Sequence, residues 1–213
     1  MTDDQEFNLT DLLKDKFFLT KEFFEKPEVV EEEPDDFEYS KNQNKEPVVK
    51  KLVDPNRGKV EALPAIQNRV IGLYFSAGWC PPCQQFTPLL KSLHEELEER
   101  KCPFQVVFIS FDKTENDMEE YFTEKHGDWL AIPFKDPLIE ELKSRYEVNA
   151  VPKLIIVQED GEVITTKGRK EVQDRGYLSY RTWRQNVNLV EGGTLNPQRK
   201  DKNSEQSTEN VTG

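Results

Sequence analysis

Apolar residues along the middle of the chain follow two spacings, one typical of strands and the other of helices. Residues 70–76 form a near-continuous apolar run, as expected of a parallel strand that is buried on both faces. Residues 82–100 carry apolar side chains at every third or fourth position, which predicts an amphipathic helix. Similar patterns predict strands over 106–110, 154–157 and 163–165, and helices over 114–125, 138–146 and 178–190. This order indicates an α/β sandwich with a central mixed sheet.

The pattern is absent from both ends of the chain, and the composition agrees. Apolar residues make up 35% of the 213 residues, below the ~45–50% usual for a globular domain, and the net charge is −12. Much of that charge lies in residues 1–48, which hold 15 acids and 6 bases. Residues 191–213 are polar and have little to bury. Residues 49–190 have a net charge close to zero, and they are numerous enough to bury a core. We therefore expect a folded domain over 49–190 between two mostly disordered tails.

A cluster of leucines and phenylalanines interrupts the acidic N-terminal segment. Its members are Leu9, Leu12, Leu13, Phe17, Phe18, Phe23 and Phe24. Their spacing is partly helical, and Thr10 or Asp11 is placed to cap a helix. Two interpretations stay open: a disordered tail with a transient helix, or a helix that docks onto a partner or onto the domain itself.

Composition and pattern exclude several functional classes. A protein that binds nucleic acid through its phosphates usually carries a basic excess, whereas this chain is acidic. A membrane span needs about 18 consecutive apolar residues, and the longest apolar stretch here covers residues 70–75 with Gly72 inside it. The start of the sequence shows no secretory signal, and three cysteines do not make a disulfide framework. We therefore expect a cytoplasmic monomer, with the nucleus as the alternative location, that binds neither nucleic acid nor membrane.

The chemistry of the chain is expected at Trp79-Cys80-Pro81-Pro82-Cys83, which follows the first predicted strand and opens the long predicted helix. Backbone N–H groups and the dipole at a helix N-terminus stabilise an anion, so they favour the thiolate of Cys80. Two intervening residues bring Cys83 within bonding reach of Cys80, which allows Cys83 to resolve a mixed disulfide formed there. Proline suits the first helical positions because their N–H groups have no partner within the helix.

Two other interpretations of the cysteine pair are weaker. A zinc site would need a second pair of ligands, and none of the remaining candidates, Cys102, His94 and His126, makes such a pair with a neighbour. A structural disulfide within one helical turn would constrain almost nothing. Redox chemistry is therefore the expected role of the pair.

A second feature, Ala150-Val151-Pro152-Lys153, precedes the strand predicted over 154–157. A proline there is compatible with an ordinary edge position or with a cis peptide bond. Together with the upstream cysteine pair, it resembles the cis-proline loop of the thioredoxin superfamily, in which the backbone beside the proline pairs with substrate. This resemblance implies a substrate-binding surface made of Trp79, Val151, Pro152 and Lys153.

Further blocks narrow the resemblance to the tryparedoxin and nucleoredoxin branch, with nucleoredoxin-like proteins the most similar. The match spans about residues 50–187 and implies a thioredoxin-like three-layer α/β/α sandwich with a central mixed sheet. The absence of a signal peptide argues against the bacterial thiol reductases that share the pentapeptide. The matching blocks are residues 75–88, 109–112, 129–134, 151–154 and 161–170, followed by Arg175-Gly176.

Two positions depart from the pattern of ordinary thioredoxins. Tyr74 stands where those proteins carry a buried aspartate that helps proton transfer; a tyrosine there is similar to tryparedoxins, and we expect the proton to use water or another group. Many relatives have threonine at the position of Lys153. A lysine there is similar to the nucleoredoxin-like subgroup. Some members of that subgroup lack a complete C-x-x-C. This chain keeps both cysteines, which favours catalysis over a purely scaffolding role.

The resemblance implies a protein-disulfide reductase that cycles through the Cys80–Cys83 dithiol and disulfide. Cys80 would be the nucleophile and Cys83 the resolving thiol. Neither an organic cofactor nor a metal is implied, and the partners would be protein disulfides and a thiol reductant that the sequence does not identify. The alternative is a redox-sensitive binding protein that signals by its oxidation state with little turnover.

Four further residues have two interpretations each. Trp79 is expected to be a partly exposed contact for substrate rather than a core residue. Cys102 is expected to be an ordinary thiol rather than a regulatory one. Trp129, in an apolar block, is expected in the core rather than in the site. Asp112 either caps the following helix or lies on the rim of the site.

Overall fold

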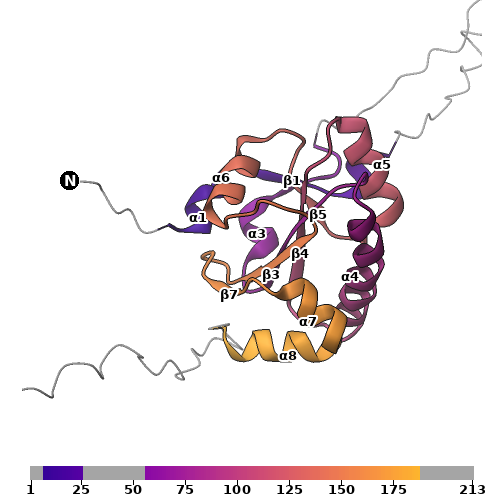
Figure 1. Cartoon of the computed structure of the whole chain (residues 1–213). Coiled ribbons are helices and arrows are strands. Elements are labelled where there is room, and N and C mark those ends of the chain that lie inside the picture. Colours follow the sequence, from indigo (N-terminus) through magenta and orange to yellow (C-terminus); the bar gives the residue numbers. More distant parts are fainter. Residues whose placement is uncertain (1–6, 26–55, 188–213) are drawn as a thin grey trace, which may run out of the picture.

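One mixed β-sheet with helices on both faces forms the centre of the molecule (Figure 1). The computed structural model describes residues 7–25 and 56–187. The strands are β1 (Phe17–Leu19), β2 (Lys59–Glu61), β3 (Val70–Ser76), β4 (Phe104–Ser110), β5 (Leu130–Ala131), β6 (Lys153–Val157) and β7 (Val163–Thr165). They lie in the order β2-β1-β5-β4-β3-β6-β7. Because β3 is parallel to β4 and antiparallel to β6, the sheet is mixed as expected.

The helices complete three layers and confirm the thioredoxin-like sandwich. They are α1 (Leu9–Leu12), α3 (Ala62–Ile66), α4 (Pro81–Glu99), α5 (Glu115–Lys125), α6 (Pro137–Arg145), α7 (Gly168–Arg175) and α8 (Tyr177–Gln185), with a 3₁₀ helix, η1, over Lys21–Phe23. Helices α4, α5, α7 and α8 cover one face, and α1, α3 and α6 cover the other. Successive side chains of β3 alternate between the two faces, so that Tyr74 packs on the first and Phe75 on the second.

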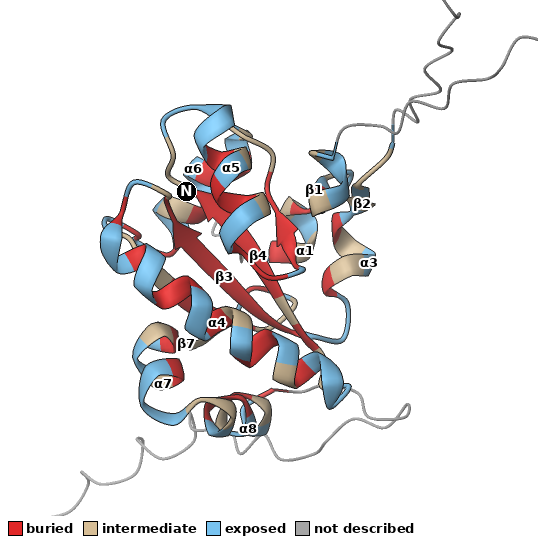
Figure 2. Cartoon of the chain, turned by 90° about the vertical axis from the view of Figure 1, so that its right-hand side faces the viewer, coloured by how far each residue is buried: buried red, intermediate tan, exposed pale blue. Residues whose placement is uncertain are grey.

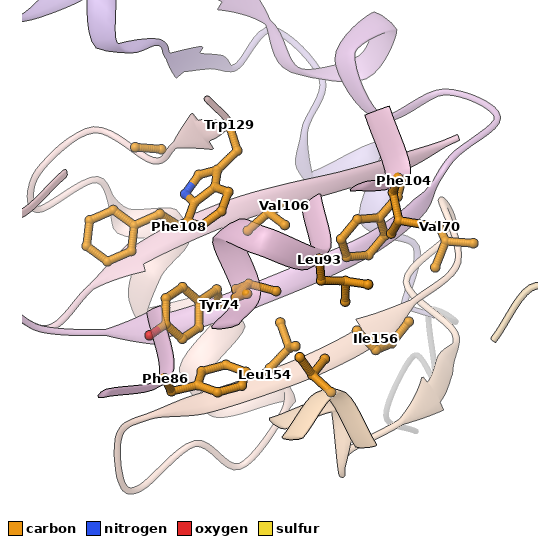
Figure 3. Close-up of a cluster of buried hydrophobic side chains, with 14 of the residues drawn as sticks. Val70, Tyr74, Phe86, Leu93, Phe104, Val106, Phe108, Trp129, Leu154 and Ile156 are labelled. Atoms are coloured by element: carbon orange, nitrogen blue, oxygen red, sulfur yellow. The ribbon is translucent and has the colours of Figure 1, made fainter. Parts of the chain in front are cut away.

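The central strands are buried along their whole length. All seven residues of β3 are buried, because both faces of the sheet are covered and neither edge of this strand is open (Figure 2). This is why β3 is apolar along most of its length, up to Ser76 at its end, instead of alternating with polar residues. Figure 3 shows the core on the α4 face, where side chains from β3, β4 and β6 meet those of α4. Labelled members include Tyr74, Phe86, Leu93, Phe108 and Leu154.

The elements around the cysteine pair agree with the sequence. Strand β3 has the predicted bounds, and α4 begins at Pro81, one residue before the prediction. Thr114 caps α5 by accepting a hydrogen bond from the Asp117 N–H at 3.1 Å. Helix α7 was not predicted, because only Gly168 and Val172 are buried in it and it has no apolar stripe. Within the described ranges, no helix is long and apolar enough to cross a membrane.

Residues 7–25 are part of the fold, although they were expected to lie in a mostly disordered tail. Strand β1 lies between β2 and β5 and extends that edge of the sheet. The reason is the amount of apolar surface that this segment buries: Leu9, Leu13 and Phe18 are each no more than 2% exposed. Of the two interpretations of the apolar cluster, docking onto the domain itself is the one observed. The helical spacing was correct only for Leu9–Leu12, because Phe17–Leu19 form a strand and Lys21–Phe23 a 3₁₀ helix. The remainder of both expected tails lies outside the described residues.

Two histidines that were considered as zinc ligands lie in the core. His126 is wholly buried, and its Nδ1 accepts a hydrogen bond from Nε1 of Trp129, itself a core residue as expected. The His126 ring packs edge-on against Phe108 and Tyr121. Burial holds the pKa of His126 well below 6.5 and lowers the pKa of His94 to about 4. Among residues 7–25 and 56–187, no three His, Cys, Asp or Glu side chains gather in a way that could hold a metal ion.

The docked N-terminal segment predicts a contrast between two adjacent phenylalanines of β1. Phe18 is 2% exposed, whereas Phe17 is 50% exposed. We expect Phe18→Ala to lower the free energy of unfolding by about 3–5 kcal/mol, because it opens a cavity in the core. Phe17→Ala should cost less than about 1 kcal/mol. Urea denaturation of both variants measures the difference, and equal losses would show that the segment does not pack as described.

The buried state of His126 predicts a loss of stability in weak acid. An unfolded histidine titrates near pH 6.5, so below that pH the unfolded chain binds a proton that the folded chain excludes. From pH 7.5 to pH 5.0 this histidine alone should remove up to about 2 kcal/mol of the free energy of unfolding. His126→Gln keeps an acceptor for Trp129 but does not titrate, so it should lose correspondingly less over the same range. Identical losses in the variant and the parent would contradict a buried, neutral His126.

Candidate functional site

The cysteine pair lies where β3 passes into α4. Cys80 is the N-cap of α4, and its Sγ accepts a hydrogen bond from the Cys83 N–H at 3.4 Å. Pro81 and Pro82 fill the first two helical positions, where a missing N–H costs nothing. The Cα atoms of the two cysteines are 5.2 Å apart, and their sulfurs are paired as a disulfide. Cys83 is fully buried and Cys80 is 4% exposed, so Cys80 is the more accessible of the two.

The loop before β6 lies against the disulfide. Its Val151–Pro152 peptide bond is cis, which decides between the two interpretations of this proline. The carbonyl oxygen of Val151 is 3.7 Å from Sγ of Cys80, and the Val151 side chain packs against the two cysteines. Lys153 begins β6 and pairs with Phe75 of β3. This strand pairing brings the predicted residues of the loop to the predicted cysteines.

Trp79 lies on the rim of the disulfide. Its side chain is 57% exposed, which confirms that it is not a core residue. Its Nε1 donates a hydrogen bond to the carbonyl oxygen of Phe111 at 3.1 Å, which orients the indole ring. Phe111 in turn packs against the buried cluster of Ala77 and the two cysteines. An indole ring that is held in solvent beside a disulfide offers a flat surface for contact.

Asp112 supports the turn that carries Trp79. Its Oδ1 accepts a hydrogen bond from the Gly78 N–H at 2.8 Å, and its Oδ2 accepts one from the Ser110 hydroxyl at 2.8 Å. Burial raises the pKa of this carboxyl above its ordinary value. Because Thr114 is the residue that caps α5, Asp112 belongs to the rim of the site rather than to the helix cap.

A hollow of about 330 Å³ lies between this turn and α5. A glycine at position 78 permits the close approach of α5, since a Cβ atom there would come within 3.1 Å of Cβ of Tyr121. The hollow opens beside Trp79, so a molecule bound over the indole ring could extend into it. Its lining comprises Gly78, Trp79, Gln84, Asp112, Lys113, Asp117, Glu120, Tyr121, Glu124 and Lys125.

Four buried hydroxyls beneath the cysteine pair are the part of the site that sequence analysis missed. Tyr74 and Ser76 come from β3, Thr87 from α4 and Tyr121 from α5. They hydrogen-bond to one another at 2.6 to 3.0 Å, and Thr87 also donates to the carbonyl oxygen of Cys83. The sequence singled out Tyr74 only because it stands where ordinary thioredoxins have an aspartate, and its hydrogen-bond partners were not predicted. The other three carry no sequence signal, because their proximity arises from three separate elements.

Cys102 lies apart from this arrangement. It follows the C-terminal end of α4, whereas Cys80 precedes the N-terminal end of the same 19-residue helix. Its thiol is free and half-buried. Its role as an ordinary thiol stays a prediction.

Comparisons with known proteins agree with the fold and the order of the motifs. A family model described as thioredoxin-like matches residues 68–163. The chain is similar to human nucleoredoxin, with 36% identity over 55% of this chain and 27% of that protein. Among solved structures, it is similar to thioredoxin from Wuchereria bancrofti (41% identity, TM-score 0.53, 62% of this chain and 92% of that one). It also resembles tryparedoxin I from Crithidia fasciculata (35% identity, TM-score 0.52, 56% of this chain and 82% of that one).

The extent of these matches differs between the two kinds of relative. The chain spans 92% of the thioredoxin structure and 82% of the tryparedoxin I structure. It spans only 24 to 33% of the length of the first nucleoredoxins that it matches. Similarity to a nucleoredoxin therefore concerns one part of that larger protein.

Proposed function

The chain belongs to the thioredoxin superfamily, in the branch of the nucleoredoxins and tryparedoxins, and on that premise we propose that it is a thiol–disulfide oxidoreductase that reduces disulfides in proteins. The observation that carries the proposal is the cysteine pair at the start of α4, with Cys80 as its more accessible member. A reactive thiolate needs a nearby source of positive potential, which the N-terminus of α4 provides.

In the first step the Cys80 thiolate attacks a sulfur of the substrate disulfide. A new S–S bond forms between them, the substrate S–S bond breaks, and the second substrate sulfur leaves as a thiolate that takes a proton from water. The positive end of the α4 dipole and the N–H group of the first turn that reaches the sulfur stabilise the thiolate before the attack. That group is the Cys83 N–H, which lies 3.4 Å from Sγ of Cys80 and also donates to the Cys80 carbonyl oxygen at 3.0 Å.

In the second step Cys83 resolves the mixed disulfide. Its thiol loses a proton to solvent, its sulfur bonds to Sγ of Cys80, and the remaining substrate sulfur leaves with the electron pair as a thiolate. The substrate is then fully reduced and the protein holds the Cys80–Cys83 disulfide. The Cα separation of 5.2 Å is ordinary for a disulfide, so the closed pair fits the start of α4. An external thiol reductant restores the dithiol.

We expect the substrate to lie across Trp79 and the loop of Val151 and Pro152, with Lys153 at its edge. The Val151 carbonyl beside Cys80 supports pairing with an extended substrate backbone. The exposed face of Trp79 supports an apolar contact next to the substrate disulfide. The hollow beside Trp79 would then receive a flanking side chain.

The cysteine pair is the redox cofactor in this proposal, and no metal or organic cofactor takes part. The partners are protein disulfides and a thiol reductant, neither nucleic acid nor membrane is bound, and the protein acts as a monomer. We assign the activity to the cytoplasm, with the nucleus as the alternative. A redox-sensitive binding protein with little turnover is the competing function, and the assay below separates the two.

Serine substitutions test the roles of the two cysteines. With insulin as the disulfide substrate and dithiothreitol as the reductant, we expect Cys80→Ser to lower the rate at least about a hundredfold, because the attacking sulfur is absent. Cys83→Ser should still attack and should accumulate mixed disulfides on a non-reducing gel. Cys102→Ser is the matched control and should keep the parental rate. Trapping by Cys80→Ser instead would reverse the assignment, and a parent protein that traps partners without turnover would favour the binding function.

The helix N-terminus predicts that the two cysteines differ in acidity. In the reduced protein, we expect the pKa of Cys80 to lie below the value of about 8.5 for a free thiol, whereas Cys83 should react more slowly because it is buried. Alkylation by iodoacetamide as a function of pH, followed by peptide mass spectrometry, reports each cysteine separately. The unfolded protein provides the reference midpoint. Equal labelling of both sulfurs with that same midpoint would refute the assignment.

A further inference from the structure

The four hydroxyls beneath the cysteine pair form one connected network that ends on the backbone of Cys83. Oγ1 of Thr87 donates a hydrogen bond to the Cys83 carbonyl oxygen at 2.9 Å. The hydroxyl oxygens of Tyr74 and Tyr121 lie 2.8 and 2.6 Å from Oγ1 of Thr87. Ser76 donates to Tyr74 at 3.0 Å and lies 3.0 Å from Tyr121. Since all four side chains are at most 4% exposed, the network is shielded from water.

The number of protons sets the direction of these bonds. Each hydroxyl has a single proton to donate. Thr87 uses its proton on Cys83, so its oxygen accepts from both tyrosines. Ser76 uses its proton on Tyr74, so Tyr74 donates onward to Thr87. Tyr121 has one proton to donate to two neighbouring hydroxyl oxygens. Its own oxygen lies 2.6 Å from Oγ1 of Thr87 and 3.0 Å from Oγ of Ser76, so the contact with Thr87 is the shorter one. The bonds therefore run from Ser76 through Tyr74 to Thr87 and end at Cys83.

We propose that Thr87 is a positioning residue for the resolving cysteine and that Tyr74 and Tyr121 aim its hydroxyl group. The inference rests on the function proposed above. The two tyrosine donors occupy the lone pairs of Thr87 Oγ1, so the Thr87 proton points to the Cys83 carbonyl. Hydrogen bonds that are aligned head to tail strengthen one another in buried surroundings. The backbone of Cys83, in the first turn of α4, is thereby held to β3 and α5.

This restraint acts on the second step of the reaction, in which the Cys83 sulfur must reach Cys80. The rate of such an intramolecular attack depends on how often the two groups adopt the reactive geometry. A looser backbone at Cys83 lowers that frequency and also makes the closed disulfide less favourable. The first step involves only Cys80 and the substrate, so it does not depend on the restraint. The four side chains contain no carboxylate, and they act through position rather than through charge.

Dithiobis(nitrobenzoate) separates the two steps without any protein substrate. In the reduced protein Cys80 displaces one thionitrobenzoate and forms a mixed disulfide with the other, which Cys83 then displaces as the ring closes. A Cys102→Ser parent removes the third thiol. Thr87→Val keeps the shape of the side chain but lacks the hydroxyl. We expect it to slow the second release about three- to tenfold, the range for one lost buried hydrogen bond, and to leave the first within about twofold.

The equilibrium with dithiothreitol should shift toward the dithiol by a similar factor in Thr87→Val. Thr87→Ser retains the hydroxyl and should restore both values. Thr123→Val is the matched control, because Thr123 in α5 makes the same bond, to the Glu119 carbonyl at 2.8 Å. It should leave both values at those of the parent.

An unchanged second release in Thr87→Val, or equal slowing in Thr123→Val, would overturn the inference. If circular dichroism shows that Thr87→Val does not fold, Tyr74→Phe/Tyr121→Phe replaces it with the same expectation, because both donors that aim the hydroxyl are then gone. A protein that closes its disulfide normally but does not reduce insulin would refute the proposed function alone. The two conclusions therefore fail in different experiments.

Discussion

Burial of β3 on every side is the constraint on which the rest of the structure depends. The strand is paired with β4 on one edge and with β6 on the other, and helices cover both of its faces. The position of its last residue, Ser76, is therefore fixed, and only four residues separate it from the start of α4 at Pro81. Because Lys153 of β6 pairs with Phe75, the cis-proline loop arrives at that place as well. Strand register, more than contacts of the cysteines themselves, brings the site together.

Polar groups beneath the disulfide are buried without charge. Removal from water disfavours the ionised form of any group, and it raises the pKa of Tyr74 far above its usual value while it lowers that of His126. The hydroxyls satisfy one another, and His126 accepts from Trp129. Charged groups are found instead at the rim, where Asp112 binds the turn before Trp79. The cysteines thus lie between a neutral interior and a polar surface.

The N-terminal segment completes the edge of the sheet beyond β5. That strand has two residues, and β1 pairs with it through Leu19 and Ala131. Two lysines of the segment reach other parts of the fold: Lys16 pairs with Asp136 at the start of α6, and Lys21 donates to the carbonyl oxygen of His126. A short strand at an open edge would present unpaired backbone groups, and the segment covers them.

The sequence by itself determined the central strands, α4 and the cysteine pair, because each is recorded in local spacing. A near-continuous apolar run over residues 70–76 predicts β3, and Cys80 and Cys83 at a helix start predict a dithiol. Pro152 had two interpretations locally, and only a family resemblance pointed to the cis form. Tertiary structure alone decided two features. Tyr74, Thr87 and Tyr121 meet because β3, α4 and α5 pack together, and Phe18 is buried because its segment meets the edge of the sheet. No local pattern contains the surface against which a segment will pack.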